Sequence, residues 1–319
     1  MICKICNNSY QNSTFHVHEM MFGFKDQFIY FQCSQCDCLQ ITEIPNNMSK
    51  YYPENYYSFR TPSYENINNP IKKLAIELRD YFAVFNKGII GRLLYTVAPN
   101  AKLRTLLQVR PAINSSILDV GCGSGALLYS LKELGFTNLL GIDPYIESDI
   151  VFKNGLKIKK QSIHDLDSTW DLIMFHHSFE HIMSPIEVLQ SVSKLLNKNG
   201  TCLISIPTVS SYAWEYYNIY WVQLDAPRHF FLHSVKSMEI LAEKSNLEIE
   251  QIVYNSTDFQ FWGSEQYLKG IPLSSDKSYS VNPSNSIFSP KKIKEFKLKA
   301  KQLNIENRGD SATFYLKKR

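Results

Sequence analysis

Short apolar runs alternate with segments of helical periodicity between residues 116 and 254. The apolar runs predict successive strands at 116–120, 139–142, 156–160, 171–175 and 201–206. Apolar residues that recur every three or four positions predict helices at 126–134, 185–196 and 235–244. Strands and helices that alternate in this way form parallel sheets with right-handed crossovers. We therefore expect an α/β domain, closed by a strand pair at 247–254 and 312–316.

The pattern changes outside this region. Residues 1–45 are rich in cysteine, and residues 46–110 combine a polar, aromatic stretch with helical periodicity. Residues 111–319 hold the alternating pattern, with an insertion at 255–310 between the last two strands. The insertion ends in a helix whose apolar positions share one face: Ile293, Phe296, Ala300 and Leu303. The sequence thus predicts a small N-terminal module, a helical linker and one larger domain.

The composition is that of a soluble globular protein. Of the 319 residues, 44% are hydrophobic and 20% are charged, which suits a domain with a sizeable core. The net charge of +4 is too small to favour a nucleic-acid partner. No apolar run reaches the roughly 18 residues of a membrane span, and the first residues lack the apolar core of a signal peptide. We therefore expect a cytoplasmic protein without a membrane span.

Five of the seven cysteines lie within the first 38 residues. Cys3 and Cys6 are separated by two residues, and so are Cys33 and Cys36. Such turns aim two sulfurs at one ion, and two of them complete the tetrahedral four-thiolate site that suits zinc. Because four thiolates leave no open position for water, the Zn²⁺ is expected to be structural. Three further side chains stay open as alternative ligands: Cys38, His16 and His18.

Glycine occupies every second position of the turn after the first predicted strand, at Gly121, Gly123 and Gly125. This spacing allows a sharp turn and a close approach of the backbone to a ligand. Asp119 lies two residues before the turn, where a carboxylate suits a cationic amine better than a pyrophosphate. Asp143 follows the second strand, where an acid can bind two ribose hydroxyls. S-adenosylmethionine, an amino acid joined to a nucleoside, would use both carboxylates.

Two further motifs follow the fourth and fifth predicted strands. They are Phe179-Glu180-His181-Ile182 and Asp225-Ala226-Pro227-Arg228-His229. Together with the Asp-x-Gly-x-Gly-x-Gly turn, they make residues 115–254 resemble a class I S-adenosylmethionine-dependent methyltransferase. The resemblance implies a Rossmann-like sheet that is mostly parallel, with an antiparallel last strand. Members with an N-terminal cysteine-rich module resemble enzymes that methylate sugars, often nucleotide-linked ones, which implies a role in polysaccharide biosynthesis.

The resemblance also implies which residues bind the cofactor. The glycine turn would face the methionine part of S-adenosylmethionine, Asp119 would act on its amine, and Asp143 would take its ribose hydroxyls. Ser162 and Ile163, after the third strand, would hold the adenine. His176, at the tip of the fourth strand, would lie near the sulfonium.

On the acceptor side, His181 is the first candidate for the general base that removes a hydroxyl proton, because imidazole titrates near neutrality. His229 is the second candidate, and Glu180 is expected to bind hydroxyls of a small polar acceptor. Arg228 is expected to pair either with a phosphate of a nucleotide-linked substrate or with Asp225. The methylated atom (oxygen, nitrogen or carbon) stays open.

Some of these sequence features also fit other functions. Gly121, Gly123 and Ala126 also match the fingerprint of NAD-linked oxidoreductases, although Asp119 argues against a pyrophosphate. Methylation of RNA or protein is an alternative with the same cofactor. A zinc-containing nucleic-acid-binding protein is a further alternative, which the small net charge does not favour.

Overall fold

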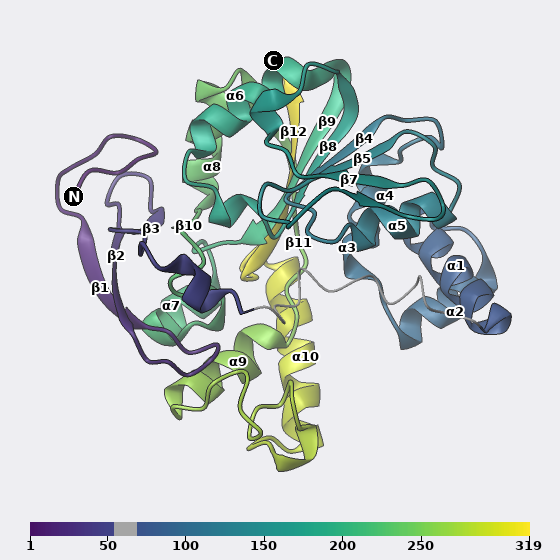
Figure 1. The fold of residues 1–319 in the computed structure, drawn as a ribbon. Helices are drawn as coiled ribbons and strands as arrows, with labels where there is room; N and C mark the ends of the chain where they lie inside the picture. Colours follow the sequence, from purple (N-terminus) through teal and green to yellow (C-terminus); the bar gives the residue numbers. More distant parts are fainter. Residues whose placement is uncertain (54–68) are drawn as a thin grey trace.

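An eight-stranded sheet forms the centre of the larger domain (Figure 1). The computed structural model describes residues 1–53 and 69–319, so the middle of the expected linker lies outside the described residues. The strands pair in the order β11-β12-β9-β8-β4-β5-β7-β6. Their bounds are β4 (Ile117–Val120), β5 (Leu139–Ile142), β6 (Ile150–Val151), β7 (Lys157–Lys159), β8 (Trp170–His176), β9 (Leu196–Pro207), β11 (Leu247–Tyr254) and β12 (Ser311–Lys318).

The strand directions confirm the predicted α/β sheet. Neighbours from β7 through β5, β4 and β8 to β9 run parallel, and β12 is antiparallel to both β9 and β11. Two details differ from the prediction. The two-residue β6 is too short to leave a periodic signal, and β9 begins at Leu196 instead of residue 201. Residues 197–200 lie at a register shift between β8 and β9. The regular alternation of a strand is interrupted there, so the sequence pattern does not mark this part of β9.

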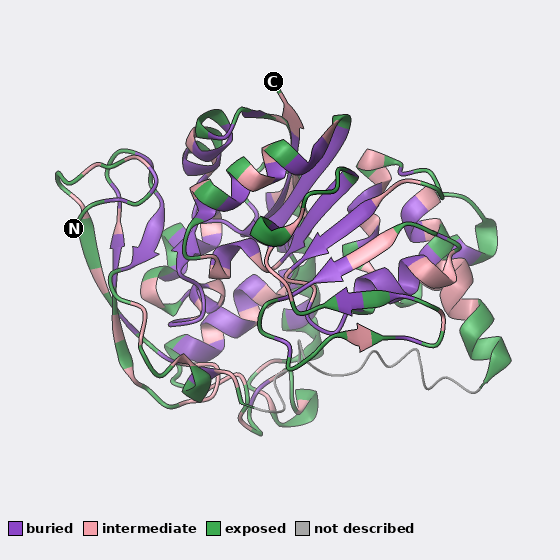
Figure 2. Cartoon of the chain, turned by 45° about the horizontal axis from the view of Figure 1, so that its top comes forward, coloured by how far each residue is buried: buried purple, intermediate pink, exposed green. Residues whose placement is uncertain are grey.

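Helices cover both faces of the sheet, because successive strand residues point to opposite sides. Ile117, Leu172 and Met174 are buried in one cluster with residues of α1, α3, α4 and α5. Leu118 and Ile173 are buried in another cluster with residues of α6 and α8. The helices are α1 (Pro70–Phe85), α2 (Ile89–Val97), α3 (Ala101–Arg104), α4 (Leu106–Val109), α5 (Ala126–Glu133), α6 (Pro185–Leu195), α7 (Tyr212–Tyr217), α8 (Val235–Lys244), α9 (Phe259–Leu268) and α10 (Pro290–Ile305). Figure 2 shows the sheet as a buried layer between these helices.

A second, antiparallel sheet holds the N-terminal residues. It has the order β1-β2-β3-β10, from β1 (Ser13–His18), β2 (Gln27–Gln32), β3 (Leu39–Ile41) and β10 (Phe231–Leu232). Its fourth strand therefore comes from the larger domain, directly after the Asp225–His229 motif. In Figure 1 this sheet lies on the opposite side of the molecule from α1 and α2. The N-terminal sheet is thus built into the region that follows β9.

The segment between β11 and β12 forms α9 and α10. The predicted apolar face of α10 is buried, with Ile293, Phe296, Ala300 and Leu303 in the core. Among the described residues, no helix combines the length and hydrophobicity that crossing a membrane requires.

Candidate functional site

The candidate cofactor residues gather at the carboxyl edge of the large sheet. From β4 the chain proceeds outward through β5 and β7, and it then returns to the other side of β4 to form β8 and β9. The strand order therefore reverses between β4 and β8, where open α/β sheets bind ligands. Asp119 lies near the end of β4, Asp143 directly follows β5, and His176 ends β8.

The glycine turn after β4 adopts the conformation that its spacing predicts. Gly121, Gly123 and Gly125 have φ angles of 70°, 55° and 77°, which L-residues with side chains rarely adopt. A Cβ on Gly121 would lie 2.5 Å from Cβ of Ser178, so glycine is also needed for close packing. The Ser178 hydroxyl donates a 2.7 Å hydrogen bond to the Val120 carbonyl. The turn is therefore held directly against the segment that carries Glu180.

Asp119 is a buried carboxyl group, with 3% of its surface exposed. Burial raises its pKa to about 7, against the opposing effect of Lys102 and with a further contribution from Asp143. The group is thus poised to lose its proton when a cation binds beside it.

Asp143 joins the two strand ends through backbone hydrogen bonds. Its Oδ2 accepts from Gly123 N at 2.9 Å, and its Oδ1 accepts from Tyr145 N at 2.8 Å. Burial raises its pKa above the usual value, although both N–H groups counteract this. Each carboxylate oxygen has a second lone pair, so the group can still accept hydrogen bonds from a diol.

The remaining candidate cofactor residues also follow strands of the large sheet. Ser162 and Ile163 begin the short 3-10 helix at residues 163–165, where the Ser162 hydroxyl accepts from His164 N. The side chain of Ile163 is buried. His176 is buried as well, and within the described residues its Nε2 makes no hydrogen bond. Burial lowers the pKa of this imidazole well below its usual value, so the ring is neutral.

Glu180, His181 and His229 come together beside this edge. One nitrogen of each ring and one carboxylate oxygen lie within 4.8 Å of one another. Nδ1 of His181 lies 2.7 Å from the carbonyl of Arg228, and Nδ1 of His229 lies 2.7 Å from the carbonyl of Gln223. Because a carbonyl only accepts, each Nδ1 carries the proton in the neutral ring and each Nε2 keeps a free lone pair. Such a cluster can receive hydroxyl protons or hold a divalent cation.

Charge is concentrated in this cluster. Glu180 is fully buried, and its Oε1 lies 3.4 Å from Nδ1 of His177 and 3.9 Å from Nε2 of His229. Burial alone would raise its pKa, but His177, His181 and His229 outweigh that effect and hold it at about 2. Burial and the neighbouring His181 lower the pKa of His229 to about 4. At neutral pH the site therefore presents an ionised carboxylate beside a neutral imidazole.

Residues 90–252 match the family model described as a methyltransferase domain, which is just over half of the chain. The chain belongs to this family. The protein is an S-adenosylmethionine-dependent methyltransferase, and the NAD-linked alternative is thereby excluded.

Individual relatives of this methyltransferase differ in acceptor. The chain is 28% identical to a ribosomal protein L11 methyltransferase of Thermosipho melanesiensis, over 62% of this chain and 74% of that protein. It is 23% identical to a tRNA U34 carboxymethyltransferase of Campylobacter fetus, over 54% of this chain and 64% of that protein. The latter match thus spans less than two thirds of the relative. A solved structure described as a putative sarcosine dimethylglycine methyltransferase of Galdieria sulphuraria is 14% identical, with 75% of this chain and 97% of that chain covered and a TM-score of 0.43.

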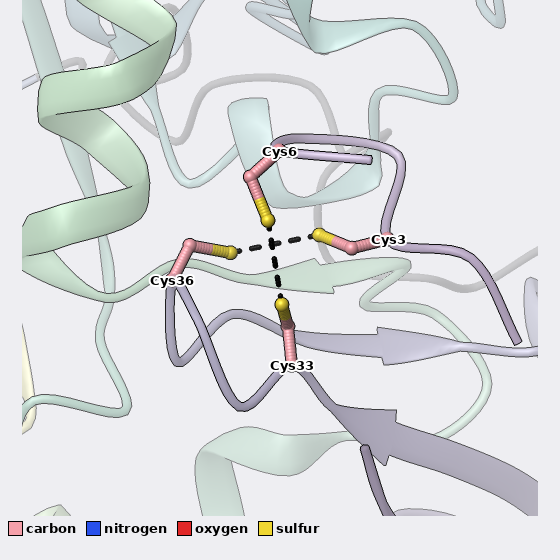
Figure 3. A group of neighbouring side chains, drawn as sticks. All are labelled: Cys3, Cys6, Cys33 and Cys36. Carbon is pink, nitrogen blue, oxygen red and sulfur yellow. Dashed lines mark hydrogen bonds between the residues drawn. The ribbon is translucent and has the colours of Figure 1, made fainter. Parts of the chain in front are cut away.

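The four predicted cysteine ligands of the methyltransferase form one cluster. Figure 3 shows the sulfur atoms of Cys3, Cys6, Cys33 and Cys36 pointing toward a common centre. The Cys3–Cys36 and Cys6–Cys33 sulfur pairs are 3.5 and 3.4 Å apart. Tetrahedral zinc with bonds of about 2.3 Å separates its sulfurs by roughly 3.8 Å, so the residues fit this ion.

The two cysteine turns share the same backbone geometry. Asn7 N donates to the Cys3 carbonyl and Asp37 N donates to the Cys33 carbonyl, both at 2.9 Å. Asn7 and Asp37 have positive φ, which these residue types tolerate. The alternative ligands lie elsewhere. Cys38 Sγ is 3.9 Å from His233 Nδ1, and His16 and His18 are exposed on β1.

Arg228 pairs with protein carboxylates instead of facing the acceptor. It is fully buried and donates to Asp225, which is one of the two partners expected from the sequence. Its other carboxylate partner, Glu19, was not predicted, because an isolated acid among apolar residues carries no motif. His177, which the motifs also leave unassigned, places its Nδ1 3.4 Å from Glu180 Oε1.

Proposed function

We propose that this enzyme transfers a methyl group from S-adenosylmethionine to a hydroxyl of a small polar acceptor, a sugar that is nucleotide-linked. The observation that carries the proposal is the cluster of the buried Glu180 and His229 with the partly buried His181, which brings an ionised carboxylate and two imidazole Nε2 atoms together. Sugars present several adjacent hydroxyl donors, which such a set of acceptors matches. Ser178 links the cluster to the glycine turn, so acceptor and cofactor would meet there.

In this proposal the cofactor lies along the ends of β4 and β5. Asp119 binds the ammonium group and Asp143 binds the two ribose hydroxyls. The backbone at Gly121, Gly123 and Gly125 faces the methionine part, which the absence of side chains there permits. Further along the same edge, three residues complete the pocket: Ser162 and Ile163 beside the adenine, and His176 near the sulfonium.

Methyl transfer is an in-line displacement at carbon. Nε2 of His181 takes the hydroxyl proton while the acceptor oxygen forms a bond to the methyl carbon, and the C–S bond breaks to leave S-adenosylhomocysteine. Glu180 accepts a hydrogen bond from a neighbouring hydroxyl and fixes the sugar. His229 lies against His181, with ring centroids 4.8 Å apart, and is a second acceptor for a sugar hydroxyl.

Glu180→Gln tests the acceptor assignment. Charge-assisted hydrogen bonds contribute about 1.5–3 kcal/mol, so the substitution should weaken sugar binding by roughly 10- to 100-fold. Calorimetric titration of the S-adenosylhomocysteine-loaded protein with a panel of nucleotide sugars measures this, and affinity for S-adenosylhomocysteine should not change. Glu187→Gln, on the outer helix α6, serves as the matched control. Wild-type protein that binds none of these sugars would contradict the proposal.

The pH dependence of cofactor binding tests Asp119. Only the ionised carboxylate holds the ammonium, and its pKa in the folded protein is about 7. Below this pH the cofactor must displace a proton, so Kd should rise up to about tenfold per unit as the pH falls. Calorimetry between about pH 6 and about pH 8 should show this slope in the wild type. Asp119→Asn should bind weakly and without the slope. A wild-type Kd that is constant over this range would rule out the role.

The cysteine cluster is proposed to hold a structural Zn²⁺. Four thiolates fill the coordination sphere, so the ion would stabilise the N-terminal sheet and take no part in the chemistry. Reduced thiolates of this kind suit the cytoplasm, where we place the enzyme.

RNA or protein is the second class of acceptor, favoured by the names of two relatives. Adding RNA and ribosomal protein to the same titration separates sugar from macromolecular acceptors. Only the true class of acceptor should bind more weakly to Glu180→Gln than to the wild type.

A further inference from the structure

The N-terminal sheet touches the backbone of the acceptor-side motif directly. The phenol of Tyr30, on β2, is fully buried and donates a 2.8 Å hydrogen bond to the carbonyl of His229. One residue further on, Ile41 N donates to the carbonyl of Phe230 at 3.0 Å. The pairing of β3 with β10 continues this contact at Phe231. The backbone of His229 is therefore hydrogen-bonded to the N-terminal sheet just before the chain enters β10.

A buried ion pair provides a second connection. Arg228 donates to Asp225 Oδ1 at 2.6 Å and to Glu19 Oε1 at 3.2 Å. Glu19 is itself fixed, because its two oxygens accept from Phe22 N and Phe24 N at 2.9 Å each. The backbone carbonyl of Arg228 accepts a hydrogen bond from Nδ1 of His181. Glu19 thus orients Arg228, and the carbonyl of Arg228 in turn fixes the orientation of the His181 ring.

We propose that Tyr30 and Glu19 are positioning residues for methyl transfer. They fix the backbone carbonyls of Arg228 and His229, and through them the Nε2 atoms of His181 and His229. Both act through the motif backbone, because the Tyr30 hydroxyl is bound to the His229 carbonyl and Glu19 is bound to the Arg228 side chain. The inference rests on the proposed function of the cluster, and it gives the N-terminal sheet a role in catalysis beyond its own folding.

The effect follows from the geometry of proton transfer. His181 must place Nε2 within hydrogen-bond reach of the acceptor hydroxyl, and its tautomer depends on the bond from Nδ1 to the Arg228 carbonyl. A shift of about 1 Å in such a group can reduce turnover by about 100-fold. The proposed cofactor carboxylates, Asp119 and Asp143, take no part in the hydrogen bonds of Tyr30 and Glu19, so cofactor affinity should be insensitive to the same shift.

Tyr30→Phe tests the proposal with the loss of a single oxygen atom. We expect kcat with the accepted sugar to fall roughly tenfold or more, with the Kd for S-adenosylhomocysteine and the metal content unchanged. Tyr10→Phe is the matched control, because Tyr10 lies in the same N-terminal region and its side chain is exposed. It should turn over like the wild type. Kinetics are measured well below the melting temperature of each variant, so that unfolding does not contribute.

Glu19→Gln gives an independent second variant, and the protonation state of His181 gives a readout without turnover. Nitrogen-15 NMR of the imidazole should report Nδ1–H for His181 in the wild type, and a mixture of tautomers in either variant. Unchanged kcat and tautomer in both variants would overturn the positioning role, even if their melting temperatures fall. If the wild type itself methylates no sugar, the proposed function fails, whereas the NMR measurement still decides the positioning of His181.

Discussion

His181→Ala should reduce methyl transfer by about 100- to 10,000-fold, the range contributed by a general base. The Nδ1 proton of His181 is bound to the Arg228 carbonyl, so Nε2 is the nitrogen with a free lone pair toward the cluster. Alanine removes this acceptor and leaves the hydroxyl proton without a base. The cofactor carboxylates, Asp119 and Asp143, are untouched, so the Kd for S-adenosylmethionine should stay within about twofold.

Two further variants separate loss of the base from loss of structure. His16→Ala, at an exposed position of β1, should retain full activity. His229→Ala should cost less than His181→Ala, because burial keeps the pKa of His229 near 4 and makes it a poor base at neutral pH. Rates from stopped assays with the accepted sugar measure each effect. Turnover of His181→Ala within a few-fold of the wild type would assign the base elsewhere.

Removal of one cluster cysteine should unfold the N-terminal sheet. Structural zinc contributes roughly 10 kcal/mol or more of folding free energy in small zinc modules, so Cys33→Ser should lower the melting temperature by about 10 °C or more. It should also abolish zinc binding, as measured by elemental analysis of the purified protein. Because β10 and the His229 carbonyl are anchored on this sheet, turnover should be lost as well.

The control for this experiment is the fifth cysteine of the N-terminal region. Cys38 is equally buried but faces His233 instead of the cluster. Cys38→Ser should therefore keep one equivalent of zinc and most of its activity. Zinc that survives Cys33→Ser but not Cys38→Ser would show that the ligand set is wrong.

The parts of the fold that follow from local patterns could be predicted from the sequence. Apolar runs located β4, which contains Asp119, and β5, which Asp143 follows, and the glycine spacing predicted the sharp turn after β4. The paired cysteines likewise predicted the cluster near the N-terminus, because two turns of fixed spacing are local geometry.

Contacts between distant segments could not be predicted in this way. β10 has only two residues, and its pairing with β3 joins positions that are separated by most of the chain. Glu19 binds Arg228 from the N-terminal region, and no periodicity marks an acid that meets its partner only after folding. The same holds for Tyr30, which looks like an ordinary core aromatic until its hydroxyl is seen against the His229 carbonyl.

In the proposed reaction, the cofactor's methyl group goes to a sugar hydroxyl held by Glu180 and His181. Incubation of the enzyme with carbon-13-methyl S-adenosylmethionine, a panel of nucleotide sugars, RNA and ribosomal protein shows which of these acceptors takes the methyl group. We expect one sugar to gain a single methylene in mass and NMR to place the labelled carbon on a former hydroxyl oxygen, in a reaction that His181→Ala abolishes. Label found only in RNA or protein, with every sugar unchanged, would contradict it.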